Sequence, residues 1–65
     1  MSTTEEKLAA IEREIKYRRR VYQHRVLAGL MSKDFANKQI AIFEEIADDY
    51  RAIAKRERLD LYECL

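Results

Sequence analysis

A chain of 65 residues forms one small domain, and a domain of this size buries only about 60% of the surface that its unfolded chain exposes. Its 13 basic and 12 acidic side chains nearly cancel, so the overall charge gives no general attraction to nucleic acid or to an anionic membrane. The single cysteine excludes a disulfide within the chain, and with one histidine it supplies no ligand set for a structural metal. Self-association is the remaining source of added stability.

No stretch of the sequence approaches the roughly 20 apolar residues that span a bilayer. The first residues also lack the basic and apolar regions of a secretory signal. We therefore expect no membrane contact and a cytoplasmic location.

The first predicted helix covers about residues 3–28. Thr3 followed by Glu6 fits a capping box, in which each side chain accepts a hydrogen bond from the other residue's backbone N–H. An apolar stripe follows at helical spacing, formed by Leu8, Ile11, Ile15, Tyr22 and Val26. Gly29, the only glycine, can adopt the left-handed conformation that ends a helix, and we expect a turn over residues 29–32.

The second predicted helix covers about residues 33–60. Ser32 is suited to cap its N-terminus, and Asp34 to interact with the positive end of the helix dipole. Its core positions follow the spacing of antiparallel helix pairs, and they are Ala36, Phe43, Ile46, Tyr50 and Ile53. We place Ile46 in the middle of the seam between the helices, while Ala47 and Ala54 are small enough to allow a close approach.

Together these elements predict an all-α fold, an antiparallel two-helix hairpin. The short turn places residues opposite each other when their numbers sum to about 63. This register sets residues 16–20 of the first helix beside an acidic block, namely Glu44, Glu45, Asp48 and Asp49. It leaves residues 61–65 without a partner inside the hairpin, so we expect this apolar tail to need another chain or to fray.

A second apolar stripe on the first helix is formed by Ala10, Tyr17, Val21 and Ala28. On the second helix Phe35, Ile42 and Ile53 lean to one side of the main seam. Because a two-helix hairpin can bury only one stripe, we predict that Ala10, Tyr17, Val21, Ala28, Phe35 and Ile42 form an interface. A dimer that closes a four-helix bundle is the favoured form, while a different partner protein or partial shielding by long neighbouring side chains are the alternatives.

The basic residues of the first helix offer a second candidate site. Arginine binds phosphate through paired hydrogen bonds and aromatic rings stack on bases, so Arg18, Arg19, Arg20 and Arg25 could contact a phosphate or an acidic partner. At helical spacing, however, these arginines point in different directions round the helix. Ion pairing with the acidic block, within the chain or between subunits, is therefore the favoured interpretation, and nucleic-acid or nucleotide binding, including an anti-defence function, is the alternative.

No residue pattern indicates catalysis, a cofactor or a metal. His24 has no nucleophile or further ligand on its helix face. The acidic pairs at residues 44–45 and 48–49 lack the Glu-x-x-His pattern of di-metal helix sites, and no glycine-rich loop is present to hold a phosphate. We therefore expect a protein that is not an enzyme.

Two segments carry a resemblance to known proteins. They are residues 17–22 with Val26, Gly29 and Met31, and residues 39–51. These segments resemble short uncharacterised accessory proteins of tailed bacteriophages and prophages. The resemblance implies a small phage-type protein, made in the cytoplasm of a bacterial host, that acts by binding or inhibiting a host protein.

Overall fold

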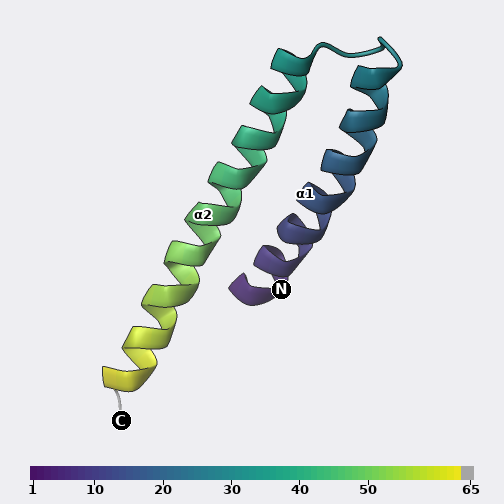
Figure 1. Ribbon diagram of the computed structural model, residues 1–65. Coiled ribbons are helices and arrows are strands. Elements are labelled where there is room, and N and C mark those ends of the chain that lie inside the picture. Colours follow the sequence, from purple (N-terminus) through teal and green to yellow (C-terminus); the bar gives the residue numbers. More distant parts are fainter. Residues whose placement is uncertain (64–65) are drawn as a thin grey trace.

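The computed structural model describes the backbone of residues 1–63 and the side chains of residues 1–61. Two helices, α1 (Thr4–Leu27) and α2 (Lys33–Glu63), lie side by side in an antiparallel hairpin (Figure 1). The described residues contain no strand, which confirms the predicted all-helical hairpin. Residues 61–65 form the predicted apolar tail. Of their side chains only that of Leu61 lies within the described residues, and it is exposed.

The first helix begins at the predicted capping box. The backbone N–H of Glu6 donates to the Thr3 hydroxyl at 3.1 Å, and the Thr3 N–H donates to the Glu6 carboxylate at 3.1 Å. Because both of these N–H groups would otherwise lack a helical partner, the box satisfies them and fixes the start of α1.

The turn is closed by Gly29, whose φ of 75° is accessible to a residue without a side chain. Its N–H donates to the Val26 carbonyl at 3.1 Å, and the Leu30 N–H donates to the Arg25 carbonyl at 2.9 Å. This pair of bonds is a Schellman motif, which ends α1 as the sequence predicted. Ser32 then accepts a hydrogen bond from the Phe35 N–H at 3.1 Å and caps α2.

The core is thin and consists mainly of alanine. The buried side chains of the described residues are those of Ile15, Ala36, Ala47 and Ala54. Ala47, with no exposed surface, occupies the centre of the seam, and Ile46 is only half-buried. The prediction that Ile46 lies in the middle was therefore wrong, because successive helical residues point about 100° apart and Ala47 takes the inward direction.

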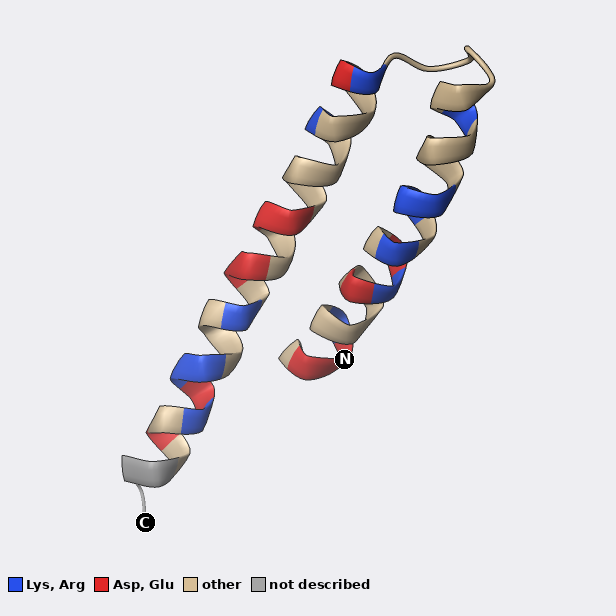
Figure 2. Ribbon diagram, in the orientation of Figure 1, with Lys and Arg blue, Asp and Glu red and all other residues tan. Residues whose placement is uncertain are grey.

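Contacts across the seam confirm the predicted register. Arg19 forms an ion pair with Glu44, and Arg51 pairs with Glu12 at 3.9 Å. In both pairs the residue numbers sum to 63, as expected for a short turn. Figure 2 shows the result as basic residues in the middle of α1 level with acidic residues of α2.

The hairpin is much more extended than a compact domain of its length. It measures 55 × 19 × 15 Å, and its radius of gyration is 15.7 Å. A compact chain of the same length would have a radius of gyration of about 11 Å. No helix among the described residues is both long enough and apolar enough to cross a membrane.

Candidate interaction surface

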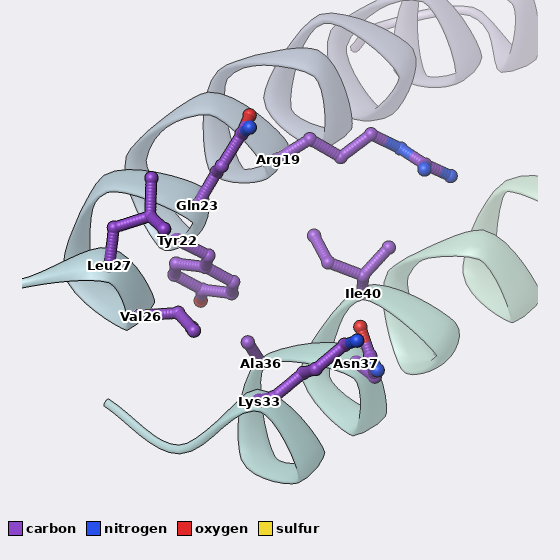
Figure 3. Close-up of a pocket in the computed structure, with 9 residues that line it drawn as sticks. All are labelled: Arg19, Tyr22, Gln23, Val26, Leu27, Lys33, Ala36, Asn37 and Ile40. Atoms are coloured by element: carbon purple, nitrogen blue, oxygen red, sulfur yellow. The ribbon is translucent and has the colours of Figure 1, made fainter. Parts of the chain in front are cut away.

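A groove lies between the helices near the turn, and Figure 3 shows the residues that line it. Its volume is about 700 Å³. Its walls carry apolar, basic and amide side chains, and none of the lining residues has a carboxylate. The residues that line it are Arg19, Tyr22, Gln23, Val26, Leu27, Lys33, Ala36, Asn37 and Ile40. The sequence alone does not indicate this groove, because its wall residues come from two helices and combine predicted core positions with solvent-exposed ones.

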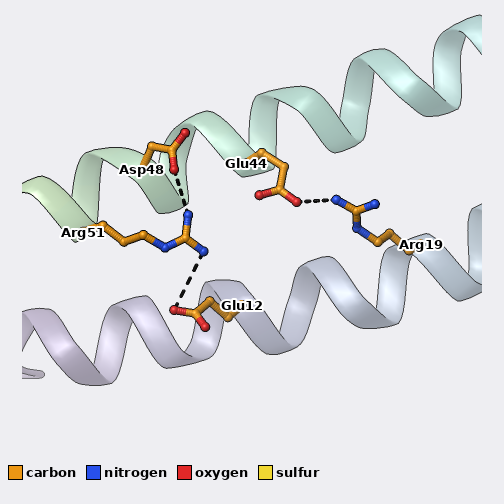
Figure 4. A network of polar contacts seen from close by, with 5 residues as sticks. All are labelled: Glu12, Arg19, Glu44, Asp48 and Arg51. Carbon is orange, nitrogen blue, oxygen red and sulfur yellow. Dashed lines mark hydrogen bonds and ion pairs between the residues drawn. The ribbon is translucent and has the colours of Figure 1, made fainter.

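One long flank of the hairpin is polar, and we call it the polar flank. Here Arg19 pairs with Glu44, while Arg51 bonds Asp48 at 2.7 Å and reaches Glu12 at 3.9 Å (Figure 4). These side chains are all at least one-third exposed to solvent. Exposed ion pairs stabilise a fold by roughly 0–1 kcal/mol each, so their main effect is to favour one register.

The opposite flank of α2 is apolar. Phe35, Ile42 and Ile53 are 51%, 41% and 42% exposed, and Ile46 between them is half-buried. At about 100° per residue these side chains lie about 100–140° round the helix from Ala47, on the side away from Glu44 and Arg51. They form an apolar row along α2 in which each residue except Ile46 is at least two-fifths exposed.

The second stripe of α1 lies on the same side of the hairpin. Tyr17 is 59% exposed, Val21 is half-buried, and Ala10 and Ala28 are exposed. The stripe lies about 140° round α1 from the buried Ile15, in the direction away from Arg19. We call this stripe together with the α2 row the apolar flank. It brings together all the residues of the predicted interface.

Arg18 covers the seam on the apolar flank. Its guanidinium donates to the Glu14 carboxylate at 2.7 Å and to the Tyr22 hydroxyl at 2.8 Å, and it lies 4.3 Å from the centre of the Phe43 ring. The hydrogen bonds to Tyr22 and to Glu14 raise the pKa of Arg18 above its usual value. An arginine held in this way by its own chain is poorly placed to bind a phosphate.

The four candidate arginines do not converge on one site. Arg18 lies on the apolar flank, Arg19 is paired on the polar flank, and Arg20 and Arg25 are exposed without an ion pair among the described residues. Among the described residues, Arg19 is the one of these four arginines that pairs with the acidic block within the hairpin. Arg18 instead pairs within its own helix, because Glu14 lies one turn away.

His24 is exposed, and no group of three side chains suited to hold a metal occurs in the part of the chain that the structure describes. No polar side-chain atom of these residues is buried without a hydrogen-bond partner.

Comparison with models of known protein families, with curated proteins and with solved structures gives no match for this chain. Arguments about function therefore depend on the surface of the hairpin itself. Within that surface, the apolar flank is the feature that a two-helix fold does not account for.

Proposed function

We propose that this protein is a non-enzymatic protein-interaction module, which associates with itself through the apolar flank as a dimeric four-helix bundle. The observation that carries the proposal is the exposure of Phe35, Ile42 and Ile53 in one row beside Tyr17 and Val21. Contiguous apolar surface of this kind is typical of an interaction site, because burying it removes the surface from water at a gain of about 25 cal/mol per Å².

The exposed area of the hairpin supports this proposal. The chain exposes 5563 Å², whereas a compact folded monomer of 7.8 kDa would expose about 4,400 Å². The excess of about 1,200 Å² exceeds the roughly 800 Å² that each partner buries in a standard protein interface. A second helical hairpin of the same length would cover a surface of this size and shape.

The resemblance to phage accessory proteins supports a further part of the proposal. In a bacterial cytoplasm the dimer would present its polar flank and its exposed arginines to a host protein, which it binds or inhibits. Of the four candidate arginines, Arg20 and Arg25 are exposed and have no ion pair among the described residues. An acidic host surface is the partner that these groups would attract.

Nucleic-acid or nucleotide binding is the second candidate function, and the same exposed Arg20 and Arg25 favour it. Two observations weigh against it: Arg18 and Arg19 are already bonded to carboxylates, and the net charge of the chain is only +1. Phosphate binding by several arginines would give a strong dependence on salt. Titration of DNA and RNA at two salt concentrations distinguishes this function from protein binding.

Light scattering on the parent and on Val21→Glu tests the proposed dimer. We expect a dimer for the parent at tens of micromolar and a monomer for the variant, because two new carboxylates would be desolvated in the interface. Gln23→Glu is the matched control, since Gln23 is exposed beside the groove and should leave the dimer intact. A parent that scatters as a 7.8 kDa monomer would contradict the dimer.

A pull-down from bacterial lysate then tests binding to a host protein. The parent and Arg20→Glu/Arg25→Glu are compared as tagged dimers, and a protein retained by the parent and lost with the charge-reversed variant would support the proposal. Retention that does not depend on the arginines would contradict the acidic-surface partner.

A further inference from the structure

The two ends of the hairpin differ in charge, although the chain as a whole is nearly neutral. We call residues 19–44, from Arg19 to its ion-pair partner Glu44, the turn end. The turn end contains five basic and two acidic residues, whereas the rest of the chain contains eight basic and ten acidic residues. The turn end therefore attracts anionic groups, and the opposite end of the hairpin does not.

The groove between the helices lies at the turn end and opens on the polar flank (Figure 3). Two of its lining residues, Lys33 and Asn37, lie about 40–80° round α2 from the inward-pointing Ala47, on the side that carries Glu44. The polar flank is the surface that the proposed function presents to a host protein. The groove is thus a hollow within that surface.

The floor and one wall of the groove are apolar. Ala36 is buried, and Val26 and Ile40 are half-buried. Leu27, on the wall, is 79% exposed to solvent. A partner that covered Leu27 and the floor would remove this apolar surface from water, and the surface is separate from the apolar flank.

Basic residues lie toward both ends of the groove. Lys33 is the first residue of α2, where a cation opposes the helix dipole, and it has no ion pair among the described residues. Its charge therefore does not stabilise its own helix. Toward the other end Arg19 is bonded to Glu44, and the neighbouring Arg20 has no ion pair within the described part of the chain. By the register of the hairpin, the backbone positions of Lys33 and Arg19 are about 16 Å apart along the helices.

We propose that this groove binds an acidic amphipathic helix of the host protein. About 11 residues, or three turns of a helix, span a length of about 16 Å. A helix laid between α1 and α2 would place apolar side chains on the floor of the groove and a carboxylate toward each end. The proposal rests on the proposed function, because it names the part of the polar flank that the host protein occupies.

A synthetic peptide serves as the probe for the groove. It is a capped, alanine-based helix with two glutamates about 11 positions apart and two leucines between them on the same face. We expect an NMR titration of the full-length protein to shift the backbone amide signals of Leu27, Ala36 and Asn37. The same peptide with glutamine in place of both glutamates should bind at least about fivefold more weakly, because it lacks the charges that the turn end attracts.

Two lysines of α2 test the charge at the groove. Lys33→Glu should weaken binding of the acidic peptide by at least about tenfold, since it places a carboxylate in the lining. Lys38→Glu is the matched control, because it makes the same change in the same helix at an exposed position outside the lining. We expect the control to bind within about threefold of the parent.

Two exposed leucines test the apolar wall. Leu27→Ser should weaken binding of the peptide by about tenfold, because it removes the exposed part of the wall. Leu30→Ser is the control, since Leu30 is 75% exposed and lies outside the lining. It should bind within about threefold of the parent, and circular dichroism should show both variants folded, because neither leucine is buried.

Equal binding of the two peptides, or equal effects within either pair of variants, would overturn the proposed occupant of the groove. The proposed function would still stand if light scattering showed a dimer and a host protein were retained through Arg20 and Arg25. A Leu27→Ser variant that was monomeric where the parent is dimeric would mean that a second copy fills the groove, and it would overturn the proposal too. A monomeric parent would contradict the proposed dimer alone, since the peptide titration is made on either form.

Discussion

The two flanks of the hairpin use side chains in opposite ways. On the polar flank, charged groups of α1 and α2 pair with each other, as Arg19 does with Glu44 and Arg51 with Glu12. On the apolar flank, Phe35, Ile42 and Ile53 remain exposed without a covering group from their own chain. The polar flank thus favours the register within one chain, whereas the apolar flank is left available for a second chain.

Two adjacent arginines show the same difference at the level of single residues. Arg19 extends to a carboxylate across the polar flank, and its side chain is 58% exposed. Arg18 lies over the Phe43 ring with its side chain 34% exposed, bonded to Glu14 and Tyr22 of its own helix. Neighbours in a helical sequence point about 100° apart, so one basic run serves two distinct surfaces.

The largest expected effect comes from breaking the seam that separates the two flanks. Ala47→Asp places a carboxylate at Ala47, which has no exposed surface. An unpaired buried charge costs about 3 kcal/mol or more, and the larger side chain also forces the helices apart. We expect the helical circular dichroism signal of the parent to be lost at room temperature.

Ala52→Asp is the matched control for that variant. It makes the same substitution in the same helix at an exposed position, so any loss of intrinsic helix propensity is equal. We expect the control to melt close to the parent. If Ala47→Asp melted like Ala52→Asp, the seam would not pass through Ala47.

The second-largest effect is expected from a substitution on the apolar flank alone. Ile42→Glu should weaken the proposed dimer by at least about 100-fold, because two charges would enter the proposed interface. The fold of each hairpin should survive, since Ile42 is already 41% exposed. Sedimentation across a range of concentrations measures the dissociation constant.

Ala41→Glu is the control on the neighbouring residue, which is exposed on the other side of α2. It adds the same charge to the same turn of the helix and should leave the dissociation constant within about threefold of the parent value. Equal effects of the two variants would mean that the apolar flank does not form the interface.

The helix ends and the register could be predicted from the sequence because they depend on local chemistry. Thr3 with Glu6, Gly29 and Ser32 each satisfy backbone groups within a few residues of themselves, so their roles follow from residue type and spacing. A short turn then leaves little freedom in how the two helices align.

The arrangement of side chains round the seam was harder to predict. A stripe at helical spacing identifies the inward side only approximately, and Ile46 and Ala47 both fit a seam until the helices are placed together. The sequence favoured the larger residue as the centre, whereas close packing favours alanine. The groove near the turn and the contact of Arg18 with Phe43 depend on this placement too.

A smaller effect compares the adjacent arginines of the two flanks. Arg19→Ala removes an exposed ion pair and should lower the free energy of unfolding by less than about 1 kcal/mol. Arg18→Ala should lower it more, because it removes two hydrogen bonds and a cation–π contact at the seam. Urea denaturation at equal protein concentration measures both, and equal losses would contradict the distinction between the flanks.

The smallest expected effect belongs to Glu6, which lies on neither flank and serves as a reference for purely local stabilisation. The Thr3 backbone N–H and hydroxyl lower the pKa of Glu6 from its ordinary value of 4.5, since both favour the charged carboxylate. Because the pKa is lowered in the folded state, the capping box stabilises α1 at pH values above the ordinary pKa, and this stabilisation is lost as the pH falls through the lowered pKa.

We therefore expect an NMR titration of the Glu6 carboxyl carbon to have its midpoint below 4.5. Thr3→Val, which removes the hydroxyl, should move this midpoint upward. Thr4→Val is the control, because the Thr4 hydroxyl bonds Glu57 and not Glu6. The proposed dimer should be unaffected by either change, and a Glu6 midpoint that moved with Ile42→Glu would show that the start of α1 is coupled to the apolar flank.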